Sequence, residues 1–222
     1  ERMGAKNINL VTGGHFAPSI AAGIALSRTK GLSIPVVWNS SGYDSQLILD
    51  LLSDVVDIYL PDCKAVSGTA GEAIAPAADY GSVCVEAVSR MAVQKPLLFE
   101  GELLKRGTIV RHLVLPGKLD NTEEVLQTFA ARWRGAALLS LMVQFEPMEN
   151  GAAKSWHEKH HIPFRKITRR EYNMVLAMLD DYDIEDGFIQ ELSGTTEWLP
   201  DFNHDTVFPS SDFTPLWHWG QE

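Results

Sequence analysis

Short polar or glycine-bearing segments follow five aliphatic runs, and they contain the residues best suited to chemistry. These segments are residues 12–15, 39–42, 62–64, 116–117 and 144–147. Paired glycines such as Gly13 and Gly14 let a backbone approach a ligand closely and offer N–H groups, because no Cβ intervenes. Asp62 and Lys64 are alternate residues, so in an extended chain they point to one side. There they could contact a polar ligand or pair with each other, although such residues also form ordinary turns.

Known motifs for phosphate binding and nucleophilic catalysis are absent from the sequence. No GK[ST] follows the paired glycines, and neither a GxGxxG fingerprint nor a GxSxG elbow occurs. His157 and His161 have the i, i+4 spacing of two metal ligands on a helix, but the glutamate of the HExxH motif is missing. We expect a solvated polar segment there. A metal-dependent hydrolase that uses His15, His112 and Asp62 stays open as an alternative.

Two cysteines, Cys63 and Cys84, are the only thiols of the chain. Their spacing fits neither a disulfide framework nor a CxxC metal site. Free cysteine is among the residues most often buried, so the sequence predicts two buried free thiols.

The strands that would position these residues alternate with helical segments, which indicates an α/β fold with a parallel sheet. We expect strands at 7–12, 34–39, 56–61, 108–116 and 137–145. Their aliphatic density is typical of strands covered on both faces. In such sheets ligands bind beyond the carboxyl ends of the strands, where the five polar segments lie.

Capping patterns mark the expected helices. Asp44 is a candidate N-cap for the helix that follows it, while Asn121 with Glu124 and Thr168 with Glu171 have capping-box spacing. We expect helices after each of these, including one over 168–182, with Ile167 and Tyr172 placed as a hydrophobic staple, and another within 76–94. Residues 97–115 contain two extended runs around a glycine-bearing turn, which predicts a hairpin.

The composition limits the class of protein. A chain of 222 residues, 45% hydrophobic and 22% charged, is typical of one globular domain. A net charge of −10 without a marked cluster of basic residues disfavours nucleic-acid binding. Neither a membrane-spanning run nor a signal peptide is evident, so we expect a cytoplasmic protein. Residues 1–193 would form the domain, and residues 194–222 an ordered tail whose aromatics cover it, namely Trp198, Phe202, Phe208, Trp217 and Trp219.

Several of these segments, in their order and spacing, resemble the radical S-adenosylmethionine proteins related to pyruvate formate-lyase activating enzyme. The matching runs are NINLVTGGHFAPSI, VVWNSSGYDS, VDIYLPDCK, RHLVLPG with NTEEVL, and LMVQFEP. The resemblance covers roughly residues 4 to 199 and is strongest to an activating-enzyme-like branch of the family. It implies a partial (β/α)6 barrel that resembles a TIM barrel and lacks its N-terminal strand.

The resemblance also implies an activity and its cofactors. In this family a [4Fe-4S] cluster binds S-adenosylmethionine, and reductive cleavage yields a 5′-deoxyadenosyl radical that abstracts hydrogen from a substrate. An electron donor is needed, and the substrate would be a glycyl-radical enzyme, another protein or a small molecule.

Seven residues would lie at the cofactor by this resemblance. Gly13 and Gly14 would meet the methionine amino group, and Asn39 would face the cofactor. Asp62 and Lys64 match an Asp-x-Lys motif at the ribose and carboxylate. Gln144 falls near a position that often carries a histidine, and His15 replaces an acidic residue, which leaves its role undefined. No catalytic residue is assigned.

One family feature is missing from the sequence. The cluster needs three cysteines spaced CxxxCxxC, and this chain has no such motif. We therefore expect a piece of a radical enzyme without its cluster-binding segment, inactive by itself. The alternative from a different class is a cluster-free nucleoside-binding or scaffold module.

Overall fold

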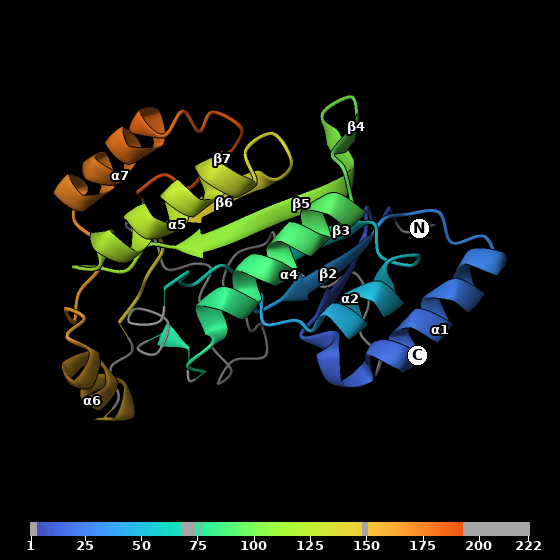
Figure 1. Ribbon diagram of the computed structural model, residues 1–222, viewed down its shortest axis with the longest axis horizontal. Coiled ribbons are helices and arrows are strands. Elements are labelled where there is room, and N and C mark those ends of the chain that lie inside the picture. The colour runs from blue at the N-terminus through green and yellow to red at the C-terminus, as the bar shows by residue number, and fades with distance from the viewer. Residues whose placement is uncertain (1–3, 68–73, 76, 148–150, 193–222) are drawn as a thin grey trace.

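The computed structural model describes residues 4–67, 74–75, 77–147 and 151–192, and its centre is one mostly parallel sheet (Figure 1). Six strands follow one another across the sheet in the order β1-β2-β3-β5-β6-β7, all parallel, and β4 pairs antiparallel with β5. The strands are β1 (Ile8–Val11), β2 (Val36–Ser40), β3 (Ile58–Pro61), β4 (Leu98–Glu100), β5 (Leu103–Leu113), β6 (Leu138–Met142) and β7 (Gly187–Ile189).

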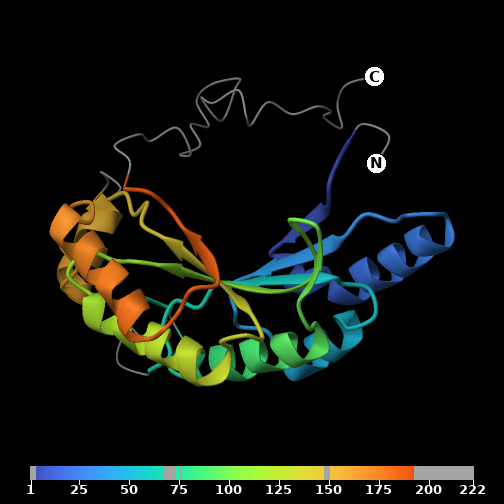
Figure 2. The same ribbon diagram turned by 90° about the horizontal axis from the view of Figure 1, so that it is seen from above.

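Helices cover the outer side of this sheet, which is curved but not closed (Figure 2). The helical elements are η1 (Gly13–Phe16), α1 (Ala17–Thr29), α2 (Gln46–Leu52), α4 (Tyr80–Gln94), α5 (Leu119–Arg132), α6 (Gly151–His160) and α7 (Arg169–Asp181). Since consecutive strands lie side by side and helices connect them, the chain forms the open, partial α/β barrel predicted from its sequence.

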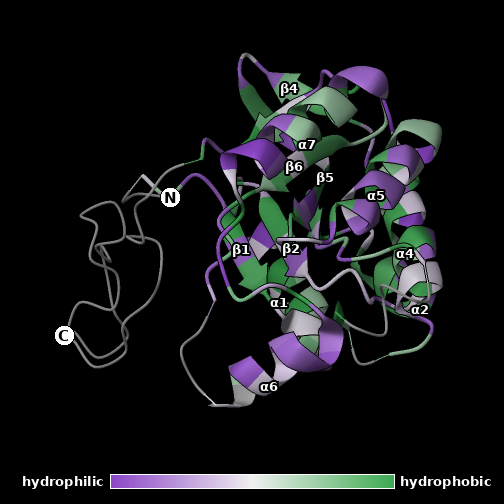
Figure 3. Ribbon diagram, turned by 90° about the vertical axis from the view of Figure 1, so that its left-hand side faces the viewer, coloured by the Kyte–Doolittle hydropathy of each residue, from purple (hydrophilic) through white to green (hydrophobic). Residues whose placement is uncertain are grey.

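The alternation of side chains along the strands divides the core from the inner face. Trp38 and Tyr59 point outward and are fully buried with Met91 of α4 in one core cluster. A second cluster lies beneath α5 and α7 and includes Phe129 and Trp133. Figure 3 shows the resulting pattern of hydrophobic strands and helices of mixed hydropathy. The opposite side chains of the strands are therefore left to line the concave face.

Two of the three predicted helix starts are wrong. Ser45, not Asp44, caps α2, because the Asp44 carboxylate is buried and accepts from the Trp38 indole and the Ser40 hydroxyl. Helix α5 begins at Leu119. Asn121 lies inside its first turn and donates to the backbone carbonyl of Lys64 instead of capping.

The third predicted helix start, Thr168 before α7, is confirmed by a complete capping box. Thr168 accepts from the Glu171 backbone N–H, and the Glu171 carboxylate accepts from the Thr168 backbone N–H. Ile167 and Tyr172 are buried in the same core cluster, as the predicted staple requires.

Other expectations differ in detail from the structure. The β4–β5 hairpin is confirmed, while η1 and β7 were not predicted, and β5 and β6 each end three residues before the expected boundary. The predicted aromatic tail, from 194 onward, lies outside the described residues. Among the helices of the described part, none combines the length and apolar character needed to cross a bilayer.

Candidate functional site

An arginine that the sequence analysis did not single out, Arg111 of β5, connects two of the predicted site residues across the concave face. Its Nη2 donates to Asn39 Oδ1 of β2 at 2.7 Å. The same nitrogen lies 2.8 Å from Asp62 Oδ1, in an ion pair whose side chains are 23% and 26% exposed. Asp62 also forms a backbone bridge with Arg111 just beyond the end of β3. The parallel register thus brings residues from three strands to one point.

The Arg111 guanidinium retains unused hydrogen-bonding capacity. Its Nε is buried and has no hydrogen-bond partner among the described residues. A buried N–H without a partner is costly, so native proteins seldom leave one unless another group satisfies it. This nitrogen is the clearest local indication that the concave face holds a polar ligand.

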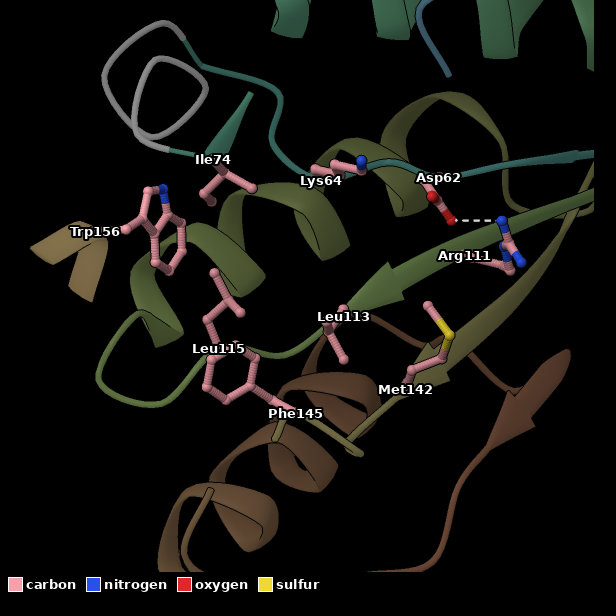
Figure 4. A pocket seen from close by; sticks show the side chains of 9 residues that line it. All are labelled: Asp62, Lys64, Ile74, Arg111, Leu113, Leu115, Met142, Phe145 and Trp156. Atoms are coloured by element: carbon pink, nitrogen blue, oxygen red, sulfur yellow. Dashed lines mark ion pairs between the residues drawn. The ribbon is translucent and has the colours of Figure 1, made fainter. Parts of the chain in front are cut away.

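A pocket of about 370 Å³ opens beside this cluster (Figure 4). That volume is within the roughly 300–1,000 Å³ of small-molecule sites. Asp62, Lys64 and Arg111 supply its charged side chains. The remaining lining is apolar and partly aromatic, and comprises Ile74, Leu113, Leu115, Met142, Phe145 and Trp156. In Figure 4 the charged groups and the rings of Phe145 and Trp156 lie at different ends of the pocket.

The segment that carries Asp62 and Lys64 is fixed by hydrogen bonds to its backbone. The Tyr80 hydroxyl lies 2.9 Å from the Asp62 carbonyl and accepts from the Lys64 N–H at 3.2 Å. Asn121 Nδ2 donates to the Lys64 carbonyl at 2.9 Å. Gly42 has φ +77°, and a Cβ there would lie 2.1 Å from the Asp62 carbonyl oxygen. Only glycine fits this contact, so the segment after β2 supports the segment after β3.

The expected alternation of Asp62 and Lys64 is confirmed, since both line the same pocket. They do not pair with each other: Asp62 pairs with Arg111, and the described residues give the Lys64 ammonium no ion pair. The pocket therefore offers two cations against one carboxylate. Such a set favours a ligand with an anionic group, whereas the apolar end favours a flat, weakly polar group.

Gly13, Gly14 and His15 lie in η1, directly beyond β1 and outside the lining of the pocket. A Cβ on Gly13 would lie 2.9 Å from both Ile20 and Trp38, whereas one on Gly14 would meet nothing within 4 Å. Core packing alone thus requires glycine at 13. At position 14 a side chain would fit. Packing therefore does not explain the glycine there, and close approach of a ligand to the Gly14 backbone could.

Gln144 lies after β6 and bonds to Gln190, the residue directly after β7. Its Oε1 accepts from Gln190 Nε2 at 2.6 Å, and Gln190 Oε1 accepts from the Val143 N–H at 3.1 Å. Gln144 does not line the pocket, although the adjacent Phe145 does. The predicted residues thus divide into a central group, Asn39 with Asp62 and Lys64, and two flanking groups.

The residues of the alternative metal site do not come together. His112 is buried on the outer side of the sheet, where its Nδ1–H donates to the Cys63 carbonyl and its Nε2 accepts from Thr122. Burial lowers the His112 pKa to about 4, so the ring is neutral at pH 7. No group of three or more possible metal ligands occurs within the described ranges.

Both cysteines are free and fully buried, as predicted. Cys63 is the residue after Asp62, and Cys84 comes from α4 and donates to the Asp62 carbonyl at 3.7 Å. The hydrogen bond with the Cys84 thiol, followed by burial, raises the Cys63 pKa well above its usual value. An iron–sulfur cluster is held by three or more thiolates that converge on one site, and two buried thiols cannot supply them.

The prediction of a solvated segment is confirmed for Glu158, Lys159 and His161, which are exposed, but it is wrong for His157. This ring is 5% exposed, and its Nδ1–H donates to the Ile162 carbonyl at 3.0 Å. It packs edge-on against the rings of Phe145, Trp156 and Phe164. His161 lies beyond the end of α6, so the two histidines do not share a helix face.

Comparison with known proteins places the fold. No model of a known protein family matches the chain. An uncharacterized protein of Methanocaldococcus jannaschii is 28% identical over 180 residues, which are 81% of this chain. The chain spans about half of that relative, 48% of its length.

A solved structure has the same architecture. It is a domain of pyruvate-formate lyase-activating enzyme from Bacteroides vulgatus, with a TM-score of 0.56 over 83% of this chain and 98% of that domain, at 10% identity. The likeness shows that the chain has the partial-barrel fold of that activating-enzyme domain.

Proposed function

We propose that the concave face of this sheet binds S-adenosylmethionine and that the chain is the cofactor-binding part of a radical S-adenosylmethionine enzyme. The observation that carries the proposal is the Asp62–Arg111 pair beside Lys64 in one pocket, with a buried Arg111 N–H that has no partner. The likeness of the fold to an activating-enzyme domain supports it.

Each part of the cofactor has a chemical counterpart on this face. The methionine carboxylate suits Lys64 and the free N–H of Arg111, since ionised partners make the stronger hydrogen bonds. The ribose hydroxyls can donate hydrogen bonds to the Asp62 carboxylate, which has acceptor atoms and no donor. The adenine suits the apolar end with Phe145 and Trp156. In the same proposal the bare backbone at Gly14 approaches the methionine amino group.

The iron–sulfur cluster of such an enzyme does not fit the residues of this chain, because the cluster needs three thiolates at one site and the chain has only two cysteines. In the radical reaction the cluster supplies the electron for reductive cleavage of S-adenosylmethionine to methionine and a 5′-deoxyadenosyl radical. In this account the cluster ligands come from outside these 222 residues, and this chain binds and orients the cofactor.

The proposal also includes an electron donor, a substrate and a cell compartment. The electron donor is a separate redox protein, and the hydrogen is taken from a glycyl-radical protein or a small molecule. The cell compartment is the cytoplasm.

A second candidate function is a cluster-free module that binds a nucleoside ligand. It is favoured by one observation: none of the residues that line the pocket is a cysteine. This module would bind S-adenosylmethionine or a related nucleoside without cleaving it.

One experiment separates the two candidates. The complete protein that contains this chain is purified without oxygen, assayed for iron and sulfide, reduced with dithionite, and incubated with S-adenosylmethionine. About four irons per chain with formation of 5′-deoxyadenosine is the expected result. Binding of S-adenosylmethionine without iron or cleavage would replace the first function by the second, and failure to bind would refute both.

A Lys64→Met variant tests whether S-adenosylmethionine binds in this pocket. It should lose cofactor affinity, whereas Lys30→Met, which removes an exposed lysine at the end of α1, should not. Equal affinity of both variants for S-adenosylmethionine would show that the cofactor does not bind in this pocket.

A further inference from the structure

A short segment of this acidic protein is strongly basic. Residues 154–170 contain six of the 19 lysines and arginines, three of the seven histidines and one of the 29 acidic residues. The segment comprises most of α6, the connection to α7 and the first two residues of α7. In a chain of net charge −10, such a concentration of positive charge makes a local surface that attracts acidic groups.

A groove of about 610 Å³ lies on this basic segment. Ile162, Pro163 and Phe164 give it an apolar floor, and Phe164 is 39% exposed. Lys154 and His161 lie at its rim, and the Lys154 ammonium is 5.8 Å from the centre of the Phe164 ring. Glu158 is its single acidic lining residue. An exposed ring between cations suits an occupant that carries apolar side chains flanked by carboxylates.

The groove is held in shape by contacts beneath it. The buried His157 ring is bonded to the Ile162 carbonyl and packed against Phe164, with ring centres 4.9 Å apart. Arg165 makes two hydrogen bonds, of 2.7 and 2.9 Å, to the Glu171 carboxylate at the start of α7. An ordered groove loses less entropy on binding than a flexible one, so it is suited to docking.

The sequence beyond the described part has the complementary chemistry. The thirty residues 193–222 contain five acidic residues and no lysine or arginine. They also contain six tryptophans and phenylalanines, and in the run EWLPDF at 197–202 Trp198 and Leu199 lie between Glu197 and Asp201, with Phe202 directly after. Fully extended, this length of chain reaches up to about 100 Å.

We infer that the acidic, aromatic residues 193–222 of this chain dock on the basic groove of α6 and its connection to α7. Tethering favours this occupant over a free acidic protein, because a segment on the same chain has an effective concentration of the order of millimolar. Trp156, which lines the cofactor pocket, belongs to the same helix, α6, as Lys154 and His157 of the groove. The inference stands on charge and shape and does not depend on the identity of the cofactor.

Carbodiimide cross-linking of the whole chain tests it, because this reagent joins an amine to a carboxylate in contact with it and adds no spacer. Mass spectrometry should find Lys154 or Lys159 joined to an acidic residue of 193–222. Lys30, exposed on α1, should give no such product. Absence of links from Lys154 and Lys159, or equal links from all lysines, would overturn the inference. In a mixture of light and isotopically heavy chains, links only between unlike chains would overturn it in favour of docking on a second copy.

Charge reversal provides an independent readout. Lys154→Glu with Lys159→Glu should speed cleavage after Glu197 by a glutamate-specific protease about tenfold. The matched control, Lys6→Glu with Lys30→Glu, introduces the same charges outside the segment and should leave the rate unchanged. Equal rates in the parent and the Lys154, Lys159 variant, in proteins with the same thermal midpoint, would contradict docking on this groove.

Discussion

Replacing Arg111 by methionine removes the group that joins β2, β3 and β5 on the concave face while keeping much of its aliphatic length. The Nη2 bonds to Asn39 and Asp62 are lost together with the buried Nε. Asp62 is 26% exposed and can take water from the pocket, so the loss of stability should be about 1 kcal/mol, as for a partly exposed ion pair. The fold should therefore persist.

The effect on cofactor binding should be larger. A hydrogen bond to a charged group contributes about 1.5–3 kcal/mol. Removing one such bond from Arg111 to the methionine carboxylate predicts a Kd about 10- to 100-fold higher. Isothermal titration with S-adenosylmethionine measures the Kd, and urea unfolding measures the stability of the same variant.

Arg90→Met is the matched control for Arg111→Met. Arg90 also pairs with an aspartate, Asp50, but on the outer surface, where the two side chains are 46% and 51% exposed. It should lose similar or less stability and no affinity. The reasoning is refuted if folded Arg111→Met binds S-adenosylmethionine as tightly as Arg90→Met does.

Three further predictions follow from packing and titration. Hydrogen bonds from Arg165, together with backbone and side-chain bonds from Thr168, lower the Glu171 pKa to about 2, so this carboxylate stabilises the fold above about pH 4.5 and less as the pH falls toward 2. Urea unfolding should show Glu171→Gln less stable by up to about 3 kcal/mol at pH 7, with a difference that shrinks toward pH 2. Burial lowers the His112 pKa to about 4, so the unfolded chain takes up this proton first and stability falls between pH 6.5 and 4. His112→Gln should flatten that part of the pH profile, and an unchanged slope would contradict the assignment. Gly13→Ala should cost about 1–3 kcal/mol through its contact with the core, while Gly14→Val should keep the stability and weaken cofactor binding. Thermal unfolding and titration check the two variants, and a Gly14→Val with normal affinity would remove Gly14 from the site.

Much of the fold was predictable because strand runs and polar strand ends are local signals. The alternation of Asp62 and Lys64 sufficed to place both side chains in one pocket. Arg111 was missed because it lies within a strand, although a charged residue inside the mostly apolar run from Ile109 to Leu115 was a usable signal. Its partners come from other strands, and only the parallel register shows that they meet.

The failures arise where tertiary contacts override local patterns. Asn121 and Asp44 have the spacing of helix caps, but both are buried and used elsewhere, at the Lys64 carbonyl and at Trp38. His157 belongs to a charged run, which indicates solvent exposure, yet rings from separate elements enclose it. No sequence period encodes contacts of this kind.

The most direct test of the central claim is a crystal structure of this chain with S-adenosylmethionine. The account predicts the methionine carboxylate at Lys64 and Arg111, the ribose at Asp62, and the adenine at Phe145 and Trp156. A cofactor bound elsewhere, or crystals soaked at saturating concentration in which Arg111 Nε still lacks a ligand partner, would contradict it.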